Sequence, residues 1–115
     1  MIKNISRNNM LAKESRICSS IFSKARGLMF SRRIKDRGLV FVFNKEDRWS
    51  LHMFFVFFPI DVLWLNKDNR VVDLKENFRP FELLAKPKDK AKYIIELPAE
   101  TIKNSNTRLG DKVLF

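Results

Sequence analysis

Three side chains of this sequence have the chemistry to recognise a polar ligand: Arg26, His52 and Asp61. His52 is the only histidine of the chain, and Asp61 follows it beyond a bend marked by Pro59. Arginine and histidine bind anions through charge-assisted hydrogen bonds, and an aspartate can orient the arginine or accept a hydrogen bond from a ligand hydroxyl. If the fold brings the three together, they predict a pocket for a small anionic or sugar-like ligand.

A structural interpretation of the same residues stays open. Asp61 can cap the bend at Pro59 by accepting hydrogen bonds from backbone N–H groups. His52 can be a hydrogen-bonded histidine of the core, and Arg26 can pair with Asp61 or with Glu76. The two interpretations differ in one observable feature, which is whether the three side chains meet at a cleft.

The sequence shows no residue pattern typical of a conventional enzyme. Cys18 is the single cysteine, and no base stands near it in the sequence, which favours a small buried side chain over a nucleophile. One histidine and one cysteine make a poor metal-binding set, and the three glycines lie too far apart to form a phosphate-binding loop. We therefore expect no metal and no cofactor, and a binding module for a small ligand or a protein partner rather than an enzyme.

Positive charge gathers in the first part of the chain. Residues 1–48 hold twelve Lys and Arg against four Asp and Glu (+8), whereas residues 49–115 hold eleven against nine (+2). A basic segment of this kind is typical of a solvated surface, but it can also bind the phosphates of RNA or DNA. The alternative function is therefore nucleic-acid binding through the densest basic cluster, which consists of Arg32, Arg33, Lys35 and Arg37.

The elements that must position these side chains are organised around residues 49–65, the most apolar stretch of the chain. Pro59 and Asp61 interrupt it, and it is shorter than the roughly 20 apolar residues that a membrane-spanning helix requires. We expect two core strands instead, over residues 50–57 and 61–66, covered on both faces. The absence of an apolar signal region at residues 1–10 and the single cysteine predict a cytoplasmic protein with no membrane contact.

The rest of the chain predicts a single mainly antiparallel β-sandwich or barrel over residues 10–115, after a flexible segment over residues 1–9. A turn at residues 44–48 and a second at residues 67–69 suggest two hairpins, and residues 77–91 form a long connection. Further strands are expected at residues 10–18, 38–43, 70–76, 92–97 and 112–115, and short helices at residues 19–27 and 98–104.

Several short motifs occur in a distinctive order. They are Arg-Gly-Leu-Met-Phe at residues 26–30, His-Met at 52–53, Pro-Ile-Asp-Val at 59–62, Arg-Val-Val at 70–72 leading to Glu-Asn at 76–77 and Pro80, Tyr-Ile-Ile-Glu-Leu-Pro-Ala at 93–99 and Gly-Asp at 110–111. This order resembles the prokaryotic family known as domain of unknown function 192, over about residues 10–115. The resemblance implies a compact, jelly-roll-like β-sandwich without an established activity. Many members have Trp-Met-Lys-Asn where this chain has His-Met-Phe-Phe at 52–55. Any role of the Lys-Asn pair in those members therefore cannot be carried over to this chain, which has two phenylalanines there.

Overall fold

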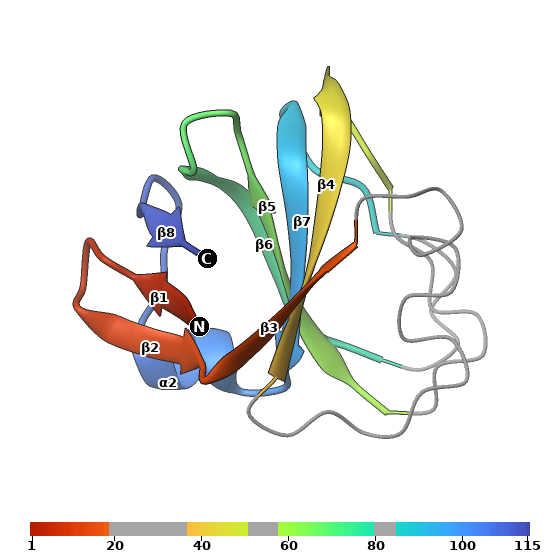
Figure 1. The fold of residues 1–115 in the computed structure, drawn as a ribbon. Coiled ribbons are helices and arrows are strands. Elements are labelled where there is room, and N and C mark those ends of the chain that lie inside the picture. The colour runs from red at the N-terminus through yellow and green to blue at the C-terminus, as the bar shows by residue number, and fades with distance from the viewer. Residues whose placement is uncertain (19–36, 51–57, 80–84) are drawn as a thin grey trace.

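The strand with the least exposed side chains, β5 (Ile60–Leu65), lies inside a five-stranded sheet, and all six of its residues are buried. The computed structural model describes residues 1–18, 37–50, 58–79 and 85–115 (Figure 1). Neighbouring strands of this sheet are antiparallel except for β3 and β4, which run parallel. The strand order is β3 (Glu14–Cys18), β4 (Arg37–Asp47), β7 (Ala91–Pro98), β5 and β6 (Val71–Phe78).

A smaller three-stranded sheet lies against one face of the larger sheet (Figure 1). Its order is β2 (Asn9–Ala12), β1 (Ile2–Asn4) and β8 (Val113–Leu114). The short helix α2 (Thr101–Ser105) follows β7 and packs beside this sheet through the buried side chain of Ile102. Among the described residues, no helix has the length and apolar composition needed to cross a bilayer.

The larger sheet is apolar on both faces, which explains why β5 shows no clean alternation of apolar and polar residues. One face packs against the smaller sheet and α2, and the core between them includes Ile2, Ala12, Leu63, Leu65, Ile95, Leu97, Ile102 and Val113. The opposite face carries a second buried cluster, which includes Cys18, Phe41, Phe58, Ile60, Val62, Trp64, Phe78 and Ile94.

The expected fold class is confirmed, because the chain forms a mainly β, sandwich-like domain with two open sheets. The predicted strands at residues 61–66, 70–76 and 92–97 correspond to β5, β6 and β7. The predicted hairpin between β5 and β6 is also present, and its turn contains Asn69 in the left-handed conformation, with φ 62°. Asparagine tolerates this conformation better than most residues, which is why its presence at residues 67–69 correctly indicates a turn.

Other expectations differ from the structure. Residues 1–9 were expected to be flexible, yet Ile2–Asn4 form β1, and Ile2 and Asn4 are fully buried. The strand expected at residues 10–18 is divided at Lys13 into β2 and β3, which belong to different sheets. The prediction of a turn at residues 44–48 is wrong for residues 44–47, because β4 continues to Asp47. The helix expected at 19–27 and most of the strand expected at 50–57 lie outside the described residues.

Gly38 allows the N-terminal strand to approach the larger sheet closely. A Cβ atom at this position would overlap Cδ1 of Ile2 and would lie 3.1 Å from Cδ2 of Leu97. We expect Gly38→Ala to lower the free energy of unfolding by about 1–3 kcal/mol, the usual cost of overpacking a core. Ile2→Val removes the overlapping atom, at a cost of about 0.5–1.5 kcal/mol on its own.

Urea denaturation of the two single variants and of the double variant measures the coupling between these positions. The double variant should be clearly more stable than the sum of the two single effects predicts, because the second substitution relieves the overlap. Strictly additive effects would contradict the contact between Ile2 and the larger sheet.

Candidate functional site

Asp61, one of the three predicted ligand-binding residues, is fully buried on β5. Its Oδ1 accepts a hydrogen bond from the N–H of Asn77 at 2.9 Å, and its Oδ2 accepts one from the N–H of Ile102 at 2.8 Å. Burial raises the pKa of this carboxyl above its usual value, and the N–H groups of Asn77, Ile102 and Glu100 counteract part of that rise. Asp61 therefore links β5 to the end of β6 and to the start of α2.

The other two members of the predicted site, Arg26 and His52, lie outside the described residues. Whether they approach Asp61 stays a prediction. The sequence had also suggested that Asp61 caps its own bend. The backbone groups that it binds in the structure lie 16 and 41 residues away in the chain.

Of the predicted nucleic-acid cluster, the structure describes one residue. Arg37 begins β4 and is exposed, with its Nε 3.7 Å from Oε2 of Glu14 on the parallel neighbour β3. Both side chains are more than half exposed, so this ion pair contributes little to stability. Arg32, Arg33 and Lys35 lie outside the described residues, and binding of nucleic acid through this cluster stays a prediction.

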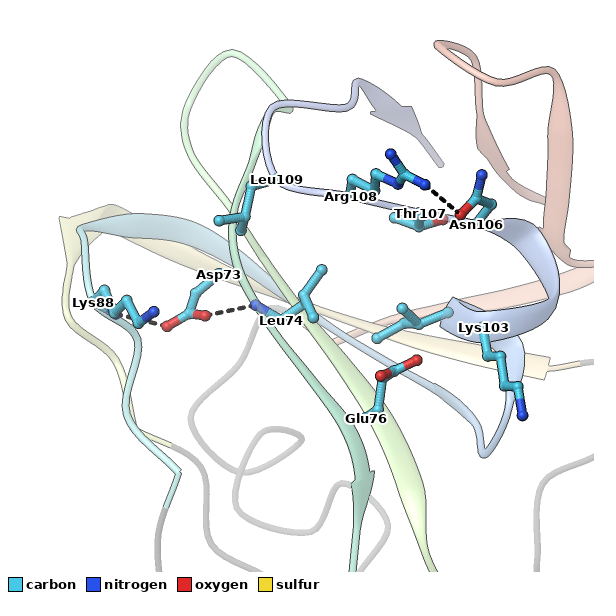
Figure 2. A pocket seen from close by; sticks show the side chains of 10 residues that line it. Asp73, Leu74, Glu76, Lys88, Lys103, Asn106, Thr107, Arg108 and Leu109 are labelled. Atoms are coloured by element: carbon cyan, nitrogen blue, oxygen red, sulfur yellow. Dashed lines mark hydrogen bonds between the residues drawn. The ribbon is translucent and has the colours of Figure 1, made fainter.

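A pocket of about 540 Å³ lies between β6 and the segment that follows α2 (Figure 2). Asp73, Leu74 and Glu76 of β6 form one wall. The other wall comes from α2 and the chain after it, and Lys88 lies near Asp73 at one end (Figure 2). The lining residues beyond β6 are Lys88, Ile102, Lys103, Asn106, Thr107, Arg108 and Leu109.

The two walls of this pocket carry opposite charge. The carboxylate of Asp73 is held by two backbone N–H groups, those of Leu74 and Lys88, each at 2.8 Å (Figure 2). On the other wall, Nη2 of Arg108 donates to Oδ1 of Asn106 at 3.3 Å, and Lys103 lies in the last turn of α2. The pocket thus offers anion-binding groups on one side and hydrogen-bond acceptors on the other.

A buried polar network holds the wall that contains Arg108. Oδ2 of Asp111 accepts hydrogen bonds from the N–H of Arg108 at 2.9 Å, from Nδ2 of Asn4 at 3.0 Å and from Nε of Arg7 at 2.6 Å. Burial on its own raises the pKa of Asp111, but these hydrogen bonds outweigh it and hold the pKa below its usual value. Asn4 also donates to Oγ1 of Thr107, so β1 fixes the pocket wall from behind.

Sequence reasoning did not find this pocket. Its charged residues come from three segments, namely residues 73–76, Lys88 and residues 103–108, and each segment alone has the composition of an ordinary solvated surface. The available signal was the Gly110-Asp111 pair near the end of the chain, because Asp111 anchors Arg108. No group of three or more His, Cys, Asp or Glu side chains with the geometry of a metal site occurs among the described residues.

A second buried carboxyl lies in the middle of the larger sheet. Glu96 on β7 is 4% exposed, and its register partners are Leu39 on β4 and Val62 on β5. Its Oε2 has no hydrogen-bond partner among the described residues. Burial raises the pKa of Glu96 to about 8, so this side chain is mostly neutral at pH 7.

The raised pKa of Glu96 predicts a pH dependence of stability. A carboxyl group with a pKa of about 8 in the folded protein and an ordinary pKa of 4.5 in the unfolded chain binds protons more tightly when the protein is folded. Its stabilising contribution is therefore full below about pH 4.5 and is lost as the pH rises through 8, with a slope of up to about 1.4 kcal/mol per pH unit.

Glu96→Gln keeps the shape of the side chain and removes this titration. The difference in unfolding free energy between the wild-type protein and the variant should change across pH 5–8 in favour of the variant, as measured by urea denaturation in steps of one pH unit. A difference that stays constant over this range would show that Glu96 does not carry the raised pKa.

The chain resembles known proteins over almost its full length. Residues 3–115 match the model of the family DUF192, described as "Uncharacterized ACR". The UPF0127 protein of Pyrococcus horikoshii is 37% identical, with 98% of this chain and 96% of the relative covered, and that of Thermococcus sibiricus is 36% identical, with 98% and 73% covered. A crystal structure of a protein of unknown function from Novosphingobium aromaticivorans has the same fold, with a TM-score of 0.83, 22% identity and coverage of 88% and 74%. The expected resemblance is therefore confirmed, and the chain belongs to the DUF192 family.

Proposed function

We propose that this chain is a binding module, and that its ligand presents an anionic group to the pocket between β6 and α2. The observation that carries this proposal is the pair of oppositely charged walls, with Lys103 and Arg108 lining the wall opposite the β6 residues Asp73 and Glu76. Clefts with an apolar lining and a few convergent polar groups are the usual form of ligand sites. Here Leu74, Ile102 and Leu109 supply apolar surface between the charges.

Lys103 and Arg108 suit an anion because the ion pairs of the described residues do not involve them. Those pairs join Arg7 to Asp111 and Arg37 to Glu14. An arginine can bind a carboxylate or a phosphate with two parallel hydrogen bonds, and a lysine adds a second positive charge. The backbone N–H of Arg108 is fixed by Asp111, which reduces the entropy lost when a ligand binds.

The opposite wall adds a preference for ligands that also donate hydrogen bonds. Each oxygen of Asp73 already accepts one backbone N–H, and each retains a further lone pair. Glu76 is exposed and has both carboxylate oxygens for hydroxyl or amide donors. A small anion that carries hydroxyl groups, such as a sugar acid, satisfies both walls.

Sodium glucuronate is a suitable first probe, with glucose and sodium chloride at equal ionic strength as references. We expect saturable chemical-shift changes of the Thr107, Arg108 and Lys103 amides with glucuronate. Lys103→Ala and Arg108→Ala should each weaken binding by about tenfold, because each loses a charge-assisted hydrogen bond. The matched control is Lys13→Ala, which removes an exposed charge outside the pocket.

The proposal fails if Lys103→Ala, Arg108→Ala and the control Lys13→Ala weaken glucuronate binding equally, since the loss of affinity would then come from the lower net charge. It also fails if sodium chloride reproduces the shifts that glucuronate produces. Thermal unfolding of each variant should remain close to that of the wild-type protein, because exposed surface substitutions usually change stability by less than about 0.5 kcal/mol.

A further inference from the structure

One wall of the pocket belongs to a strand at the edge of the larger sheet. In the part of the chain that the structure describes, β6 is the last strand of this sheet, and β5 is its one partner among the named strands. An edge strand presents backbone N–H and C=O groups that can pair with another extended chain. The pocket therefore offers backbone hydrogen-bonding groups in addition to its charged side chains.

The protein itself pairs with the beginning of this edge. The N–H of Val71 donates to the carbonyl oxygen of Asp111 at 2.9 Å, and the N–H of Gly110 donates to the carbonyl oxygen of Val71 at 2.8 Å. An isolated antiparallel bridge between Arg70 and Lys112 extends this contact. The outer edge of β6 thus accepts an extended chain at its first residues.

This pairing does not continue along the pocket. Gly110 adopts φ 87°, a conformation that favours glycine, and the residues before it form the opposite wall instead of following β6. Next to the pocket the N–H of Leu74 donates to the side chain of Asp73 rather than to another strand. Side-chain capping of this kind is one way in which proteins protect an open edge.

We propose that an extended peptide segment of a partner protein, carrying acidic side chains, adds to the edge of β6 within this pocket. The proposal rests on the function proposed above and names the class of ligand. Strand addition of this kind derives affinity from backbone hydrogen bonds and specificity from side-chain contacts. The four residues Asp73–Glu76 span about 10–13 Å of strand, enough for three or four residues of a partner.

Charge and shape both favour an acidic segment. Among the residues that line the pocket, three cations outnumber two anions: Lys88, Lys103 and Arg108 against Asp73 and Glu76. The chain as a whole carries a net charge of +10. Successive side chains of an extended peptide point to opposite sides, so acidic residues can face Lys103 and Arg108 while apolar residues contact Leu74 and Leu109. A carbonyl group of the peptide would replace the side chain of Asp73 as the acceptor for the N–H of Leu74.

The test uses the full chain and a synthetic peptide, acetyl-Thr-Val-Glu-Val-Glu-Val-amide, with a fluorescent label for anisotropy. Two further peptides carry N-methyl groups on alternate residues, one on the odd-numbered residues and the other on the even-numbered residues. A fourth peptide has lysine in place of glutamate. N-methylation removes a backbone donor, and in a strand only every second residue points its donor at the partner edge. We therefore expect one N-methylated peptide to bind about tenfold more weakly and the other to bind like the parent.

Lys103→Ala and Arg108→Ala should weaken binding of the parent peptide, Lys13→Ala should not, and the lysine peptide should not bind. Equal affinities of the two N-methylated peptides and the parent would overturn strand addition. If glucuronate binds in the pocket and the parent peptide does not, this inference falls and the proposed function stands. If neither probe binds, both fall.

Discussion

The buried carboxylate of Asp61 is the interaction on which the arrangement of the other elements depends. Helix α2 has no side-chain cap at Glu100, and that residue adopts a left-handed conformation with φ 77°. Asp61 supplies the missing acceptor from β5, and it also accepts from Asn77 at the end of β6. Without it, the buried N–H of Ile102 would be left unpaired, at a cost of about 1–3 kcal/mol. One side chain thus sets the position of α2 relative to β6.

The pocket is a consequence of that constraint and of a second polar network at the other end of the same wall. Asp111 holds the N–H of Arg108 and binds Asn4, while Asn4 reaches Thr107. Both carboxylates act through backbone and buried partners, so the two walls are fixed before a ligand arrives. Preorganised sites lose less entropy on binding, which favours a recognition function for the cleft.

The fold was largely predictable because its signals are local. The apolar run of β5, the turn after it and the strand that became β7 can be read from neighbouring residues. β1 was not predicted, because its three residues are too few to show a strand pattern, and Ile2 is buried through contacts with distant residues such as Gly38.

The candidate site was harder to predict, because Asp73 and Arg108 come to line the same pocket only in the folded chain. The sequence identified Asp61 as important but could not show that its partners lie far along the chain.

The most direct measurement of the role of Asp61 is native-state hydrogen exchange of the Asp61→Asn variant. Asparagine keeps the shape of the side chain but offers a single acceptor oxygen in place of two. Protection of the amide of Ile102 or of Asn77 should fall at least tenfold, while the amide of Ile95 in β7 should lose less. Wild-type protection at both Ile102 and Asn77 would contradict the account, because α2 and β6 would then be held together without this carboxylate.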